Sequence, residues 1–149
     1  MQLIKKEHSQ VAERAIDEVM ELQEAIEKRD DKVDSIETIH NFSEGQYIRQ
    51  VLIPAGMLVI GKRHRHKTLN VVLKGKCKIR NSDQEESYIA EAPYMYESGA
   101  NVKKAVYAYT DTIFANIHVT NEINKDKLEE QCIITEEDYN RLIENKEYK

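Results

Sequence analysis

The chain has 149 residues, 40% of them hydrophobic and 33% charged, which predicts one globular domain with its own core rather than a membrane-spanning chain. The formal net charge of −5 is unevenly spread, because residues 39–120 carry 11 basic and 7 acidic side chains whereas the segments on either side are acidic. This pattern argues against the broad basic face of a general nucleic-acid binder. It fits either a compact site for a small anion or a solvated strand surface.

The cellular compartment is predicted from the cysteines and the first residues. Cys77 and Cys132 lack CxxC spacing, so two reduced thiols are favoured over a disulfide between them. The opening MQLIKKEH has neither the apolar core nor the cleavage site of a secretory signal. We therefore expect a cytoplasmic protein without a membrane partner.

Residues 7–37 contain no glycine or proline and predict helix. Apolar residues recur there with the spacing of an amphipathic helix: Ala12, Ala15, Val19, Leu22, Ile26, Val33 and Ile36. Two interpretations stay open, a helix packed against the body of the domain and a short oligomerisation seam of about two heptads. We therefore expect residues 1–38 to form an N-terminal helical segment for packing or self-association.

Residues 42–120 change to short β-strands separated by turns. Residues 47–53 are rich in β-forming side chains and end at the turn Pro54-Ala55-Gly56, and residues 76–80 alternate charged with apolar side chains. Turns recur about every 8–12 residues, which is typical of an all-β sandwich or barrel. We expect a β-barrel over residues 39–121.

Residues 122–149 predict a helical tail. Thr135-Glu136-Glu137-Asp138 resembles a capping box with Asp in the position of the usual Glu. Tyr139, Leu142 and Ile143 then form one apolar face of a short C-terminal helix.

The segment GKRHRHKTLN, residues 61–70, places two histidines two positions apart in a run of cations. Residues two apart on a strand share a face, so His64 and His66 can converge on one metal ion. The same face also holds Lys62, Thr68 and Asn70, which together suit an anion. On this register Arg63, Arg65 and Lys67 project outward, toward solvent or a partner subunit.

Several motifs follow one another in a recognisable order. Pro54-Ala55-Gly56, then His64-x-His66, then Asn70 and Gly75, resemble the first motif of the cupin superfamily; the block with Pro93, Gly99, Asp111-Thr112 and His118 is similar to the second. The closer resemblance is to small single-domain cupin-like proteins encoded by bacteriophages and prophages. It is carried by His40-x-Phe42-x-x-Gly45-x-Tyr47-x-Arg49, Gly61-Lys62-x-His64, Leu69-Asn70, Lys74-Gly75, Tyr107-Ala108 and His118-Val119-Thr120. The resemblance implies a mainly β fold: a single jelly-roll cupin-like barrel with an N-terminal amphipathic helix and a short C-terminal helix.

The resemblance also implies where a metal would bind. The cupin site uses both histidines of HxH, a Glu four residues later and a His after the glycine of the second motif. His64 and His66 fill the first two positions, but Asn70 replaces the Glu, and the last position falls in residues 100–104, which contain Lys103 and Lys104 but no His. Because transition metals usually need three protein ligands, we expect no cofactor. The alternative is a divalent metal on His64 and His66, completed by His118 if its strand turns it inward.

A lysine at the lost ligand position favours an anion site. The expected ligand-binding residues are Lys62, His64, His66, Asn70, Lys103, Lys104, Tyr107 and Tyr109. The two tyrosines would stack on a base. Tyrosines and lysines at strand spacing are also common core and edge residues, so that interpretation stays open.

We therefore expect a non-enzymatic homo-oligomer, associating through the barrel edge and the N-terminal helix, that holds a small anionic molecule. The ligand would be a nucleotide or a nucleotide-derived host defence signal, which a phage protein would sequester. Two alternatives stay open: a metal-dependent oxygenase, isomerase or epimerase, and a structural or assembly component of a virus particle.

Overall fold

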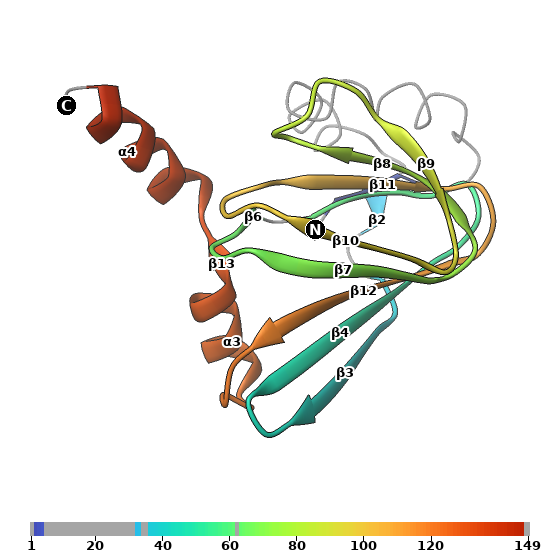
Figure 1. Cartoon of the computed structure of the whole chain (residues 1–149), viewed down its shortest axis with the longest axis horizontal. Coiled ribbons are helices and arrows are strands. Elements are labelled where there is room, and N and C mark those ends of the chain that lie inside the picture. Colours follow the sequence, from blue (N-terminus) through green and yellow to red (C-terminus); the bar gives the residue numbers. More distant parts are fainter. Residues whose placement is uncertain (1, 5–31, 34–35, 62, 148–149) are drawn as a thin grey trace.

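The computed structural model describes residues 2–4, 32–33, 36–61 and 63–147, which form two facing antiparallel β-sheets and two C-terminal helices (Figure 1). The first sheet has the order β2 (Lys32–Val33), β1 (Gln2–Ile4), β5 (Leu58–Ile60), β11 (Lys104–Ala108), β8 (Lys76–Asn81) and β9 (Tyr88–Glu91). The second has the order β10 (Tyr94–Ser98), β7 (Thr68–Lys74), β12 (Thr112–Val119), β4 (Gln46–Ile53) and β3 (Thr38–Ser43). A separate pair joins β6 (Arg63–His64) to β13 (Ile133–Ile134). The predicted mainly β fold is confirmed, but the two sheets do not close into one hydrogen-bonded barrel.

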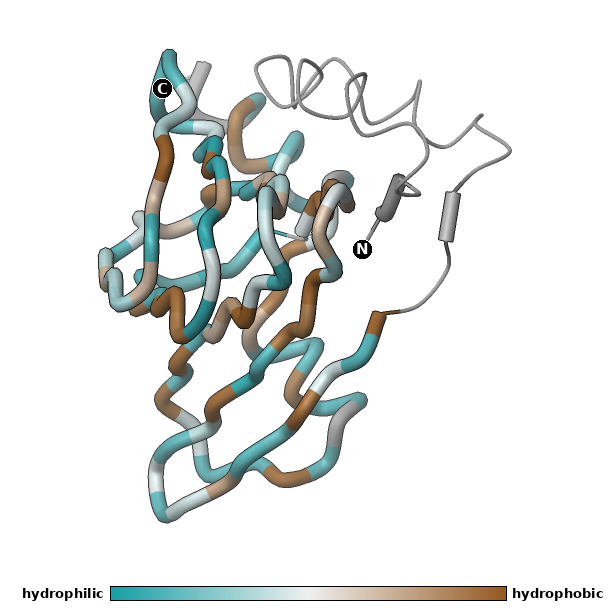
Figure 2. The backbone as a smooth tube through the Cα atoms, turned by 90° about the vertical axis from the view of Figure 1, so that its right-hand side faces the viewer, coloured by the Kyte–Doolittle hydropathy of each residue, from teal (hydrophilic) through white to brown (hydrophobic). Residues whose placement is uncertain are grey.

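The core lies between the two sheets, and the alternation of residue types along each strand builds it (Figure 2). On β4, Val51 and Ile53 are buried, and on β12 Phe114 is buried. Val59 of β5 and Val106 of β11 belong to the same core cluster from the opposite sheet. Polar residues at the same inward register, such as Arg49 and Asn116, therefore also point between the sheets.

The N-terminal helix predicted over residues 7–37 lies mostly outside the described residues. Where the chain is described, the prediction is wrong at Lys32–Val33, which pair as strand β2 with β1. β1 in turn pairs with β5, so the first described residues extend the larger sheet. A short strand can form here because an existing sheet edge supplies hydrogen-bond partners, which helical periodicity does not register.

The C-terminal tail is helical, as predicted, and contains two helices: α3 (Lys125–Cys132) and α4 (Glu136–Glu147). Asn124 caps α3 by accepting hydrogen bonds from the backbone N–H groups of Asp126 and Lys127. Thr135 caps α4 by accepting from Asp138 N at 3.1 Å. Leu142 and Ile143 of the predicted apolar face are exposed, and α4 projects away from the sheets (Figure 1). In the part of the chain that is described, no helix has the length and apolar character needed to cross a bilayer.

Arg63 corrects the register expected for the cationic segment. It was predicted to project outward, but only 3% of it is exposed. Its Nη1 donates to Asn101 O at 2.8 Å, and the guanidinium lies 3.7 Å from the ring centroid of Tyr139. β6 ends at His64 and a bend follows before β7, so residues 62–70 do not form one continuous strand. Their side chains therefore do not alternate regularly between two faces, as the prediction assumed.

Gly75, in the turn from β7 to β8, offers a first testable prediction. Its φ is +89°, and a Cβ there would lie 2.3 Å from the backbone oxygen of Asp111. We expect Gly75→Ala to lower the free energy of unfolding by roughly 2–3 kcal/mol, because the left-handed conformation and the steric overlap both act against alanine. Urea unfolding measures the change.

Gly99→Ala is the matched control, because a Cβ at Gly99 would meet Val102 Cγ2 at 3.5 Å, an ordinary contact. We expect a change below about 1 kcal/mol. Equal destabilisation by the two substitutions would contradict the described turn.

Candidate functional site

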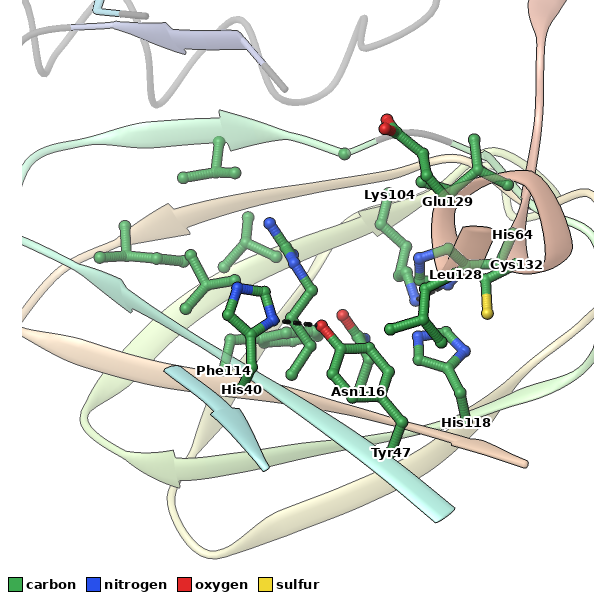
Figure 3. A pocket seen from close by; sticks show the side chains of 17 residues that line it. His40, Tyr47, His64, Lys104, Phe114, Asn116, His118, Leu128, Glu129 and Cys132 are labelled. Atoms are coloured by element: carbon green, nitrogen blue, oxygen red, sulfur yellow. Dashed lines mark hydrogen bonds between the residues drawn. The ribbon is translucent and has the colours of Figure 1, made fainter. Parts of the chain in front are cut away.

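A cavity of about 300 Å³ opens between the two sheets, with α3 beside it (Figure 3). Its apolar wall consists of Val51, Ile53, Val59, Val106 and Phe114. Its polar wall consists of His40, Tyr47, Arg49, His64, Lys104, Asn116, His118 and Glu129. The alternation of side chains explains the arrangement: Tyr47, Arg49, Val51 and Ile53 share one face of β4, and Phe114, Asn116 and His118 share one face of β12.

Lys104 brings an amine into the cavity from the larger sheet. It is 5% exposed, and its Nζ donates to Asn70 Oδ1 at 2.5 Å and to Ser98 Oγ at 3.4 Å. His64 Nδ1 lies 3.5 Å from the same nitrogen. Burial lowers the pKa of Lys104 to about 7, because a charged ammonium loses its hydration.

Asn70 lies behind the cavity and connects the two sheets. Its Oδ1 accepts from Lys104 Nζ and from Asn116 Nδ2, the latter at 2.6 Å. Its Nδ2 donates to Ser98 Oγ at 3.0 Å and to Thr68 O at 3.1 Å. The side chain is fully buried, so these bonds fix both its amide orientation and the position of the Lys104 amine.

Two histidine rings flank Lys104. His64 and His118 meet edge to face, with ring centroids 4.9 Å apart. Burial and then the charge of Lys104 lower the pKa of His64 well below its usual range. The same two causes, together with the charge of Arg49, lower the pKa of His118 to about 4. Both imidazoles are therefore neutral at physiological pH and act as hydrogen-bond donors and acceptors rather than as cations.

The opposite side of the cavity carries Arg49 and an aromatic wall. The ring of Tyr47 stacks between His40 and His118, at 5.8 Å from each ring centroid, and its Oη is hydrogen bonded to His40 Nδ1 at 2.5 Å. Burial lowers the pKa of Arg49 from its ordinary value, and the nearby charge of Glu129 opposes this shift. A guanidinium remains protonated across the physiological range.

The helix α3 forms one side of the cavity. Leu128, which is 4% exposed, lines it together with Glu129 and Cys132. Arg65 secures the helix, because its backbone N–H donates to Cys132 O at 2.8 Å and its Nε to Glu130 O at 3.1 Å. The C-terminal segment, which contains no predicted site residue, thus contributes directly to the site.

The predicted site residues separate into three groups. Lys104, His64 and His118 line the cavity, and Asn70 lies behind it, bonded to Lys104. Lys62 lies outside the described residues. Four others do not line the cavity: His66, Lys103, Tyr107 and Tyr109. His66 lies in the bend directly after β6 and is exposed, whereas Tyr107 is on the face of β11 opposite to Lys104 and Val106.

Five polar lining residues were not predicted as site residues: His40, Tyr47, Arg49, Asn116 and Glu129. The first three already stood together in the motif His40-x-Phe42-x-x-Gly45-x-Tyr47-x-Arg49. The available signal was the two-residue spacing of Tyr47 and Arg49 on β4 together with the pairing of β3 and β4, in which His40 is the register partner of Arg49.

The side chains do not fit the metal implied by the cupin resemblance. Among the described residues, no group of three or more His, Cys, Asp or Glu side chains is placed to hold an ion. Lys104 Nζ instead lies between His64 and Asn70, two of the positions that the resemblance assigned to ligands. An ammonium group between His64 and Asn70 would repel a metal ion bound to the same two side chains. The Lys104 amine therefore takes the place that a metal ion would occupy.

Comparison with solved structures gives likenesses at low sequence identity. KdgF from Halomonas sp. is 11% identical, with 64% of this chain and 87% of that chain covered and a TM-score of 0.51. The plu4264 protein from Photorhabdus luminescens is 11% identical, with 60% and 78% covered and a TM-score of 0.51. An RmlC-like cupin family protein with a double-stranded β-helix fold from Methanocaldococcus jannaschii is 16% identical, with 58% and 83% covered and a TM-score of 0.46.

No protein-family model and no curated protein matches the chain. The likenesses therefore concern the fold. Cupin and RmlC-like proteins are among the structural neighbours of this chain.

Proposed function

We propose that this protein binds a small organic anion in the cavity between its two sheets. One observation carries the proposal: Arg49 and Lys104, from opposite sheets, line the same largely apolar cavity. Glu129 on α3 is the single carboxylate among the described lining residues. An anionic group therefore meets a guanidinium and an amine that share the cavity with it.

The cavity also limits the size and shape of the ligand. A volume of about 300 Å³ is at the lower end of small-molecule sites and too small for a polymer. The apolar wall of Val51, Val106 and Phe114 suits a hydrocarbon or ring portion, while Arg49 suits a carboxylate or phosphate. The ligand class is thus an amphipathic metabolite with one strongly anionic group.

A more specific version of this proposal is that the bound anion is a nucleotide. Tyr107 and Tyr109 do not line the cavity, and the ring of Tyr47 already stacks on His40 and His118, so a base would instead pack against the apolar wall that includes Phe114. Sequestration of a nucleotide-derived host defence signal follows from the resemblance to phage-encoded cupin-like proteins and belongs to the same proposal.

Isothermal titration calorimetry with a panel of mononucleotides, cyclic nucleotides, phosphorylated metabolites and small carboxylic acids tests it. We expect at least one panel member to bind, and Arg49→Gln to weaken that binding by at least about tenfold, because a charge-assisted hydrogen bond is lost. Arg141→Gln is the control, since Arg141 is exposed on α4 and pairs with Glu137.

Circular dichroism and thermal unfolding establish that each variant is folded before its affinity is compared. The proposal is wrong if no panel member binds at millimolar concentration. It is equally wrong if Arg49→Gln binds the ligand as tightly as the parent and Arg141→Gln do.

A further inference from the structure

We infer that Lys104 is a nucleophilic amine that captures the carbonyl carbon of a bound anionic aldehyde or ketone as an imine. This inference rests on the proposed function, because the anionic group of the same ligand is held by Arg49. The ligand class narrows accordingly to small carbonyl compounds that carry a carboxylate or phosphate, of which a 2-oxo acid is the simplest.

The surroundings of the amine carry the first step of the inference. Lys104 Nζ lies in the cavity and meets the uncharged oxygens of Asn70 and Ser98 and the uncharged nitrogen of His64. These contacts position the nitrogen without neutralising a charge on it. A lysine used only for charge would be expected to pair with a carboxylate, whereas these partners also tolerate the neutral amine.

Deprotonation of the amine follows from its burial. The pKa of Lys104 is lowered to about 7, so roughly half of the molecules hold a neutral amine at pH 7, against fewer than about one in a thousand for an ordinary exposed lysine. A neutral amine has the lone pair that attack on a carbonyl requires. The lowered pKa thus agrees with the geometric observation that carries the inference, namely that Asn70, Ser98 and His64, and no described carboxylate, are the hydrogen-bond partners of the amine.

The chemistry balances without any oxidant or reductant. The nitrogen lone pair of Lys104 forms a bond to the carbonyl carbon, and the C=O π pair moves to oxygen. One proton passes from the nitrogen to that oxygen and gives a neutral carbinolamine. The second proton leaves the nitrogen with the hydroxyl as the C–O bond breaks, so one imine and one water are formed.

His64 is placed to carry these protons. Its Nδ1 lies 3.5 Å from Lys104 Nζ, close to the nitrogen that gives up the two protons. Leu128 of α3 lines the same cavity and is buried, so an apolar side chain limits the access of water that would hydrolyse the imine.

Reductive trapping tests the inference. The full chain is incubated at pH 7 with pyruvate as the probe and sodium cyanoborohydride, and the modified lysine is located by peptide mass spectrometry. We expect one adduct per chain, on Lys104, formed at least about tenfold faster than on the exposed lysines Lys67, Lys74 and Lys76 of the same molecule. Lys104→Met should remove this adduct and leave the slow surface labelling unchanged.

The internal comparison among lysines does not depend on the folding of the variant. Labelling of Lys104 at the rate of the surface lysines, or not at all, overturns the inference. Calorimetry on the parent protein separates the two proposals. If an anion binds but no covalent adduct is trapped, the proposed function stands and the inference that Lys104 forms an imine is overturned. Absence of both binding and trapping overturns both.

Discussion

Replacement of Lys104 by methionine is expected to stabilise the fold at pH 6 by about 2–4 kcal/mol, the largest stabilisation that we predict for a single substitution in this protein. The pKa of the buried amine falls from an ordinary 10.5 to about 7. Below pH 7 the folded protein carries a desolvated ammonium, which lowers the free energy of unfolding by roughly 3–5 kcal/mol. Methionine has a similar shape and no charge, so it removes that cost but also loses the hydrogen bond to Asn70.

The pH dependence identifies the cause. The pKa of this basic group is lower in the folded than in the unfolded state, so the penalty is complete below pH 7. It shrinks as the pH rises from about 7 to about 10.5, where the unfolded chain also loses the proton. The stability difference between variant and parent should therefore decrease over this window.

Urea unfolding of parent and variant at pH 6, 8 and 10 measures this difference, and the titration of groups that do not interact with Lys104 cancels in the comparison. A variant that is less stable than the parent at pH 6, or a difference that does not change with pH, would contradict the expectation. The buried ammonium also bears on function, because a residue that destabilises the fold is most readily explained by a role in the site.

Asn70→Ala is expected to have the opposite effect, lowering the free energy of unfolding by about 3–5 kcal/mol. The alanine leaves Lys104 Nζ and Asn116 Nδ2 without their shared acceptor, and it removes the donor to Thr68 O and Ser98 Oγ. All of these groups are buried or partly buried, so water does not replace the lost bonds at full strength.

Asn41→Ala is the matched control, because Asn41 is exposed on β3 and accepts one hydrogen bond, from Gln50. We expect it to change stability by less than about 0.5 kcal/mol. A double-mutant cycle sharpens the test: the cost of Asn70→Ala should be smaller in the Lys104→Met background, where no amine is left without an acceptor. Equal costs in the two backgrounds would show that Asn70 does not support Lys104.

Several features of the fold could be predicted from the sequence because they depend on local pattern. Period-2 alternation and regular turns indicated a mainly β domain, and the capping residue Thr135 indicated a C-terminal helix. Lys103 and Lys104 stood out at a position where the cupin resemblance expects a histidine. The structure places Lys104 in the cavity, whereas Lys103 does not line it.

The expected helix over residues 7–37 shows the limit of local pattern. Helical spacing at Val33 was outweighed at residues 32–33 by pairing with β1, a partner about 30 residues away in the sequence. The outward placement of Arg63 failed for a related reason: β6 pairs with β13 of the C-terminal segment, and the arginine packs on Tyr139.

The alternation of strands and turns, the cupin-like order of the motifs, and a lysine instead of a histidine near the second motif can all be recognised in the sequence. Which polar residues share a cavity depends on the tertiary structure. Arg49 and Lys104 are 55 positions apart and belong to different sheets, and α3 reaches the same cavity from the C-terminal segment. The physical reason is that a strand pattern fixes which side chains share a face, whereas the sheet that each face meets depends on pairing and packing between distant segments.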